Sequence, residues 1–249
     1  MRAVARMAIM SAKGWTAAAA ACAIGMLATS GEAAPRRTTE RPVVVELFTA
    51  QGCAGCPEAN LAVEQAAETP GVIALTYGVD YWDYLGWRDT FAKPAFSARQ
   101  RAYRSAMRLR GVSTPQVVIA GRTQLTGARE AELGNAIQRE ATRESWPPQI
   151  EFRETGRQVG VGSGRAPAGG AEVVAVTYRP GPQVVEVAAG DNRGEAVRHM
   201  NVVREVTRLG DWRGRPVLFD LPVRATGEET VVMVQGKSDR RILGAAASR

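Results

Sequence analysis

Apolar residues in the first half of the chain occur in short continuous runs separated by mixed segments. The runs at 43–48 and 72–79 are typical of buried strands. Between them, the segment 57–68 places Leu61 and Val63 among acidic and polar residues, as in an amphipathic helix. We therefore predict a β-α-β unit in which this helix connects two strands.

Two more helices and a hairpin complete the predicted first half. The pattern predicts helices over 94–110 and 128–143, and it predicts a hairpin between a strand that starts at Pro115 and a strand at 122–125. The arginines of the 94–110 helix are interpreted as a solvated face. Attraction of an acidic substrate is the alternative.

From Gln149 onward the pattern changes to short runs divided by Gly- and Pro-rich turns. Many strands at this spacing, with no helices between them, are typical of a sandwich-like or barrel-like β domain. The composition changes near Pro147-Pro148, so we predict an α/β domain with an insertion over 40–146 and a mainly β domain over 149–246. The predicted strands lie at 150–153, 157–163, 171–178, 183–188, 197–206, 216–221, 229–235 and 240–244.

The N-terminus has the build of a secretory signal, with basic residues, an apolar run from Trp15 to Ala28 and small residues after it. We predict a signal peptide over 1–33 and a periplasmic or secreted location. The apolar run is about 14 residues, whereas roughly 20 are needed to span a bilayer, so we expect no membrane attachment after cleavage. A retained anchor is the alternative.

Charge and cysteine count change with cleavage. Loss of three basic residues and Glu32 takes the net charge from +7 to +5 (7 − 3 + 1). The basic residues are interspersed with acidic ones, so we expect no nucleic-acid partner. Of three cysteines, Cys22 leaves with the signal, and Cys53 and Cys56 remain.

The two remaining cysteines form a Cys-x-x-Cys motif. A disulfide between them would close a very short loop, which stabilises a fold least. Redox chemistry or metal binding is therefore the better reason for the pair. The motif lies between the first predicted strand and the helix at 57–68, so the helix N-terminus would favour a thiolate there.

An aromatic cluster follows the second predicted strand. It contains Trp82, Tyr84 and Trp87, in a chain that is only 6% aromatic. The cluster is either a small satellite core or the wall of a substrate cleft, because ligands of open α/β sheets bind beyond the carboxyl ends of the strands. Asp80 and Asp83 are poor candidates for a metal site in a chain with one histidine.

The order of strand, Cys-x-x-Cys, helix, strand, insertion, Thr-Pro, two strands and helix resembles the thioredoxin fold. The segments Glu46-Leu-Phe-Thr, Gly52–Pro57, Val79–Trp87 and Thr114-Pro115-Gln116 resemble more closely an uncharacterised exported thioredoxin-like family, domain of unknown function 1223. The resemblance covers essentially the mature chain. It implies a thioredoxin-like first domain in which Pro115 is cis and lies against the cysteine pair.

The resemblance also implies roles for individual residues. Cys53 would be the nucleophile and Cys56 the resolving thiol, while Thr114 and Pro115 would present backbone to a substrate strand. Two positions depart from ordinary thioredoxins: Gly52 replaces a tryptophan, and Leu47 falls near the position of a buried aspartate. Glu46, one position away, is a candidate proton carrier.

We therefore expect an exported thiol-disulfide oxidoreductase that acts on protein thiols or disulfides and exchanges electrons with a redox donor or acceptor protein. Its only cofactor would be the redox-active Cys53–Cys56 disulfide, and we assign no metal ligands. Two alternatives stay open. One is a non-catalytic partner-binding module. The other is Cu(I) handling by the two thiolates, for which His199-Met200 is the one other soft pair.

Overall fold

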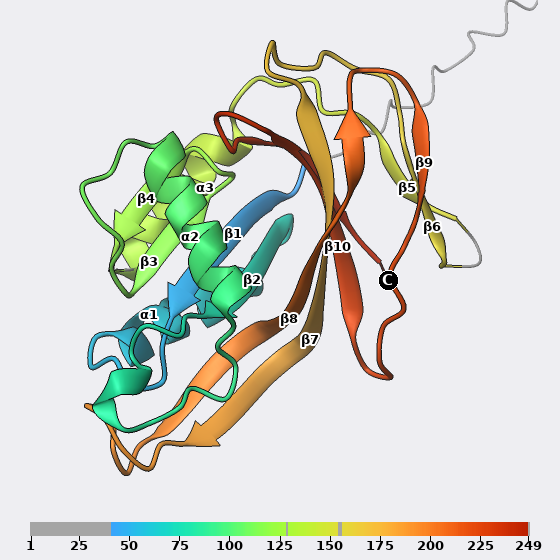
Figure 1. Ribbon diagram of the computed structural model, residues 1–249. Coiled ribbons are helices and arrows are strands. Elements are labelled where there is room, and N and C mark those ends of the chain that lie inside the picture. Colours follow the sequence, from blue (N-terminus) through green and yellow to red (C-terminus); the bar gives the residue numbers. More distant parts are fainter. Residues whose placement is uncertain (1–40, 128, 154–155, 249) are drawn as a thin grey trace, which may run out of the picture. The chain divides into compact units, whose positions relative to one another are not determined.

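The computed structural model describes residues 41–127, 129–153 and 156–248 (Figure 1). The predicted signal peptide and Cys22 lie outside these residues. Among those described, no helix is both long and apolar enough to cross a bilayer. In chain order the elements are β1 (Val43–Thr49), α1 (Cys56–Ala67), β2 (Val72–Gly78), the 3-10 turn η1 (Asp83–Leu85), α2 (Pro94–Ala106), β3 (Gln116–Ile119), β4 (Thr123–Thr126), α3 (Glu130–Ala141), β5 (Ile150–Phe152), β6 (Gln158–Val161), β7 (Ala171–Glu186), β8 (Ala196–Trp212), β9 (Val217–Asp220), β10 (Glu229–Gly236) and β11 (Ile242–Ala247).

A mixed eight-stranded sheet runs through the described residues in the order β11-β10-β7-β8-β2-β1-β3-β4. Strands β1 and β2 are parallel, as the β-α-β prediction requires, and β3 is antiparallel to β1 and forms a hairpin with β4. Strand β8 joins β2 through the parallel pairing of Thr76 with Val202. A second, antiparallel sheet has the order β5-β6-β9.

Strand β1 is buried along its whole length because helices cover both of its faces. On one face, Val45 and Leu47 belong to a cluster shared with α1 and α3. On the other face, Val44 and Phe48 pack with Tyr103 of α2, which passes in front of β1 in Figure 1. A continuous apolar run is the sequence signature of such a doubly covered strand.

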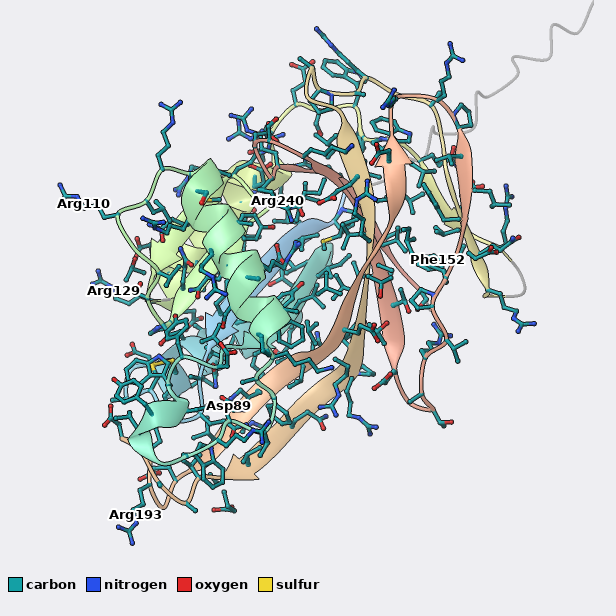
Figure 2. The ribbon with its side chains drawn as sticks, in the orientation of Figure 1. Asp89, Arg110, Arg129, Phe152, Arg193 and Arg240 are labelled. Carbon is teal, nitrogen blue, oxygen red and sulfur yellow. A yellow bond between two sulfur atoms is a disulfide. The ribbon has the colours of Figure 1, made fainter. Side chains whose placement is uncertain are left out.

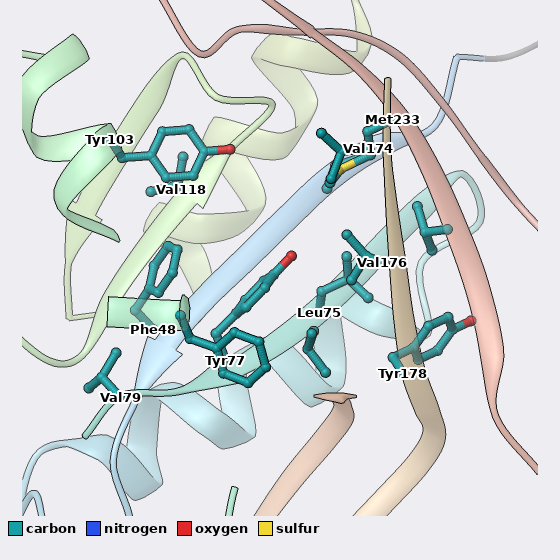
Figure 3. Close-up of a cluster of buried hydrophobic side chains, with 14 of the residues drawn as sticks. Phe48, Leu75, Tyr77, Val79, Tyr103, Val118, Val174, Val176, Tyr178 and Met233 are labelled. Carbon is teal, nitrogen blue, oxygen red and sulfur yellow. The ribbon is translucent and has the colours of Figure 1, made fainter. Parts of the chain in front are cut away.

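The hydrophobic cluster on the α2 side of the sheet continues onto the later strands. Figure 3 shows Phe48 and Tyr77 in one cluster with Val176 of β7 and Met233 of β10. The other side of β7 and β10 packs against the three-stranded sheet, with Trp212 buried between them. The described residues belong to one compact unit, so the segments predicted as two domains share one sheet.

Three predictions from the pattern are wrong in detail. Leu61 points outward from α1 and is 54% exposed, because small residues such as Ala59 and Ala62 form the buried face instead. Helix α2 ends at Ala106, before the predicted end at 110. The predicted strands 171–178 and 183–188 are one strand, β7, which continues past a register shift against β8.

Candidate functional site

Cys53 lies in the connection between β1 and α1, and Cys56 lies at the start of α1. Cys56 is the first residue of the helix, and its N–H donates to the carbonyl of Cys53 at 3.0 Å. The two residues form a disulfide with a Cα–Cα separation of 5.4 Å. No side chain caps this helix N-terminus. The free N–H groups and the helix dipole therefore favour negative charge at the sulfur atoms once the disulfide is reduced.

Pro115 lies against the turn between the cysteines. The Thr114–Pro115 peptide bond is cis, as the resemblance implied. A Cβ placed on Gly55 would stand 3.6 Å from the Cδ of Pro115, in ordinary contact. Pro115 is buried and Thr114 is half-buried. The structure thus brings the Thr-Pro pair and the Cys-x-x-Cys turn together from positions about sixty residues apart in sequence.

The residue two positions before Cys53 is held by the aromatic insertion between β2 and α2. The backbone N–H of Gln51 donates to Asp89 Oδ2 at 2.7 Å, and its side chain bonds to Thr90 Oγ1 at 2.8 Å. Trp87 Nε1 donates to Gln51 Oε1 at 2.8 Å. Burial raises the pKa of Asp89, although backbone N–H donors, that of Gln51 first, oppose the shift. The insertion fixes the backbone that leads into the motif.

The three aromatic residues predicted as a substrate wall have different surroundings. Trp87 is half-buried and donates a hydrogen bond to Gln51, so it helps to hold the segment that leads into the motif. Trp82 is half-buried against the core and stacks on Tyr84, with ring centroids 6.5 Å apart. Tyr84 is 79% exposed. Both readings of the cluster therefore apply to parts of it: a satellite core, and an exposed aromatic surface on the same insertion.

The turn of the β7–β8 hairpin also reaches the motif. Asn192 is buried, and its Nδ2 donates to the carbonyls of Gln51 and Cys53, each at 2.8 Å. Gly190 lies against Gly52: a Cβ on Gly190 would stand 3.2 Å from Gly52 Cα. With neighbours on both sides, Cys53 is only 2% exposed and Cys56 is fully buried.

Glu46 is the centre of a buried ion pair. Arg99 donates to both carboxylate oxygens, at 2.7 and 3.1 Å, and Tyr103 donates to the second. Gln235 of β10 completes the network through Arg99 and Tyr103. Burial alone would raise the pKa of Glu46, but the charge and hydrogen bonds of Arg99 outweigh it and lower the pKa.

This network changes two interpretations made from the sequence. Arg99 is buried, not part of a solvated arginine face, because it neutralises a carboxylate on the sheet. A proton carrier needs a pKa near the working pH, whereas the pKa of Glu46 is lowered from 4.5, away from neutral pH. We therefore assign Glu46 a structural role.

His199 is buried in β8, edge-on to Phe91 at a centroid distance of 5.2 Å. Burial lowers its pKa to about 4, so the imidazole is neutral at pH 7. In the part of the chain that the structure describes, no three His, Cys, Asp or Glu residues gather as metal ligands would.

Sequence reasoning missed the two side chains that hold the motif from outside. Asp89 follows the aromatic cluster without a distinguishing pattern of its own. Asn192 lies in the stretch Gly190–Gly194, which reads only as a turn. The one local signal was the glycine at 190, where a side chain would press on Gly52.

The chain is similar to known proteins over most of its length. The family described as "Protein of unknown function (DUF1223)" matches residues 44–235. A crystal structure of a protein from Agrobacterium tumefaciens is 31% identical, with a TM-score of 0.67, over 82% of this chain and 92% of that one. HBP35 of Porphyromonas gingivalis shares the fold at 12% identity and a TM-score of 0.58, over 84% and 75% of the two chains. None of the curated proteins compared with the chain matches it.

Proposed function

Because the chain belongs to the DUF1223 family of proteins of unknown function, we propose its function from its own residues: an exported thiol-disulfide oxidoreductase of thioredoxin type. The observation that carries the proposal is the Cys53–Cys56 disulfide at the N-terminus of α1, with the cis Pro115 against it. A helix N-terminus lowers the pKa of a cysteine thiol and so raises the thiolate fraction.

The thioredoxin-like assignment of the first segment is part of the proposal. It is supported by the central β1, which pairs in parallel with β2 across α1 and antiparallel with β3. It is supported also by the helices on both faces of β1, with α1 and α3 on one and α2 on the other. In this arrangement the motif and the Thr-Pro turn occupy one end of the sheet.

The chemistry needs no group besides the two sulfur atoms and a partner. In the reducing direction, the Cys53 thiolate attacks a substrate disulfide, forms a mixed disulfide and releases one substrate thiolate, which takes up a proton. Cys56 then loses its proton and attacks Cys53 Sγ, which closes the Cys53–Cys56 disulfide and releases the second substrate thiol. Two electrons pass to the substrate, and a donor protein returns them; the reverse sequence oxidises a dithiol.

Substrate contact is proposed for the surface beside the motif. Tyr84 is exposed, stacks on Trp82 and projects from the insertion that holds Gln51. Pro115 adjoins the turn between the cysteines, and Thr114 directly precedes it in the chain. We propose protein thiols or disulfides as substrates, with Tyr84 and the Thr-Pro turn as residues that contact them.

The test is turnover of a protein disulfide or dithiol by wild-type protein and by single cysteine variants. We expect Cys53→Ser to abolish turnover and Cys56→Ser to accumulate mixed disulfides, because only the second thiol resolves them. Equal, small effects of both substitutions would contradict the catalytic assignment. A matched control is Arg110→Ala, because the Arg110 side chain is exposed and points away from the ribbon in Figure 2.

The same variants separate the alternatives. A partner-binding module on this scaffold is favoured by the burial of both cysteines, and it predicts that the double Cys53→Ala/Cys56→Ala variant keeps its partner. Cu(I) handling predicts about one Cu(I) per reduced chain, lost in either cysteine variant. Turnover that depends on Cys53 would exclude both as the main role.

A further inference from the structure

The β7–β8 hairpin ends in a turn over Val187–Glu195, which we call the tip. It is closed by its own backbone: Gly194 N–H donates to the Val187 carbonyl at 2.7 Å, and Val187 N–H to the Glu195 carbonyl at 3.0 Å. Gly190 has a φ of 83°, in the left-handed region that favours glycine. The tip is therefore a turn held in shape by its own backbone hydrogen bonds.

Three contacts place the tip on the segment that enters the motif. Asn192 Nδ2 bonds to the carbonyls of Gln51 and Cys53, and Asp191 N–H points to the Gly52 carbonyl at 3.3 Å. Gly190 packs on Gly52 so closely that a Cβ on Gly190 would stand 3.2 Å from Gly52 Cα, a tight contact. The hydrogen bonds of Asn192 join residues that are 139 or more positions apart.

The hairpin below the tip is anchored separately. Asn60 Nδ2 of α1 donates to the Arg198 carbonyl at 2.8 Å, and Arg198 pairs with Glu64 at 2.5 Å. Release of Asn192 would therefore free the tip without detaching β8 from α1. Arg193, in contrast, points into open space at the end of the hairpin (Figure 2).

The position of the tip matters because of how disulfides react. A thiolate attacks one sulfur in line with the bond to the other, so Cys53 Sγ must be open on the side away from Cys56. In this structure Cys53 is 2% exposed. Attack by a protein partner then requires a local opening, and the contacts of Asn192 oppose it.

We propose that the tip is a lid on the Cys53–Cys56 disulfide and that Asn192 is the positioning residue that latches it. The inference rests on the proposed function in that a partner must reach Cys53. The lid favours partners that displace the tip and protects the disulfide from others. Asn192 acts through the backbone of Gln51 and Cys53 and touches no reacting atom.

The experiment measures reduction of the oxidised protein by dithiothreitol. One of its thiolates attacks Cys53 Sγ and expels Cys56 as a thiolate; its second thiolate then attacks the mixed disulfide, closes the cyclic disulfide and releases Cys53 as a thiolate. We expect Asn192→Ala to speed reduction roughly 25-fold, since each of two neutral hydrogen bonds shifts an opening equilibrium by roughly 5-fold. The isosteric Asn192→Asp should do the same, because a carboxylate cannot donate to either carbonyl. Arg193→Ala, on the same tip, should leave the rate unchanged.

Rates for Asn192→Ala and Asn192→Asp equal to that of wild type would overturn the lid. Should these variants not fold, wild-type protein supplies the test: hydrogen exchange at the Asp191 amide should be at least roughly 10-fold slower than in an unstructured peptide, and an unprotected amide overturns the lid. Turnover of a protein disulfide or dithiol tests the proposed oxidoreductase activity separately from the lid. Faster reduction of Asn192→Ala in a protein without turnover supports the lid and contradicts only the oxidoreductase.

Discussion

The buried pair of Glu46 and Arg99 gives the strongest stability prediction, because it ties three elements together. It joins β1 to α2, and Gln235 extends it to β10. Arg99→Met leaves the buried carboxylate without its partner, while Glu46→Gln leaves a buried guanidinium. Removal of one member of such a pair costs about 3–5 kcal/mol. For a chain of this size that lowers Tm by roughly 10 °C.

The double variant Glu46→Gln/Arg99→Met separates a pair from two independent contributions. With both charges gone, nothing buried is left uncompensated, so the loss should be about 2–3 kcal/mol smaller than the sum of the single losses. Urea unfolding of the four proteins at pH 7, followed by far-UV circular dichroism, measures the cycle. Strictly additive losses would refute the reasoning.

The pH dependence adds a second check on the same variants. In wild type the pKa of Glu46 is lowered from 4.5, so its contribution is present above pH 4.5 and is lost as the pH falls through the folded-state pKa. Without Arg99, burial would raise that pKa instead, and protonation would relieve the cost. The loss caused by Arg99→Met should therefore shrink as the pH falls from 7 towards 4.5. A loss that grows in this range would contradict the assigned pair.

Three other predictions use single variants. Burial lowers the pKa of His199 to about 4 in the folded chain, against 6.5 in the unfolded chain, so the free energy of unfolding should fall by about 3 kcal/mol between pH 6.5 and 4. His199→Gln should remove this pH dependence in urea titrations, and an unchanged pH dependence would contradict the assignment. Gly190→Ala must adopt a φ of 83° against Gly52 and should lose about 1–2 kcal/mol while speeding disulfide reduction; a stable, slow variant would contradict the close contact. Tyr84→Ala, at an exposed position, should change stability by less than about 0.5 kcal/mol but raise KM for a protein substrate, and an unchanged KM would remove Tyr84 from the substrate surface.

The parts of the fold that sequence predicts are those with strong local signals. The continuous run Val43–Phe48 marks a doubly covered strand, and β1 occupies it. Pro57 and the motif mark the start of α1. The prediction that Leu61 lies on the buried face of α1 was wrong because the helix is rich in alanine. Its apolar and polar faces differ little, so the largest apolar residue does not identify the buried side.

The parts that sequence missed depend on contacts between distant segments. One arginine among the five of the predicted helix 94–110 has no sequence feature that indicates burial. The clue to Arg99 was Glu46 inside an apolar run, which needs a buried partner. Pro180-Gly181-Pro182 reads as a turn between strands, but it lies within β7 at a register shift against β8. Asn192 bonds to a backbone 139 residues away, and nothing around it indicates that.

The reduction potential of the Cys53–Cys56 couple tests the central proposal most directly. Oxidised and reduced protein would be quantified by alkylation and mass spectrometry after equilibration in thiol-disulfide buffers of graded potential. An oxidoreductase predicts one two-electron transition between about −120 and −270 mV, absent in Cys56→Ser. A disulfide that stays closed below about −300 mV would behave as a structural bond and contradict the account.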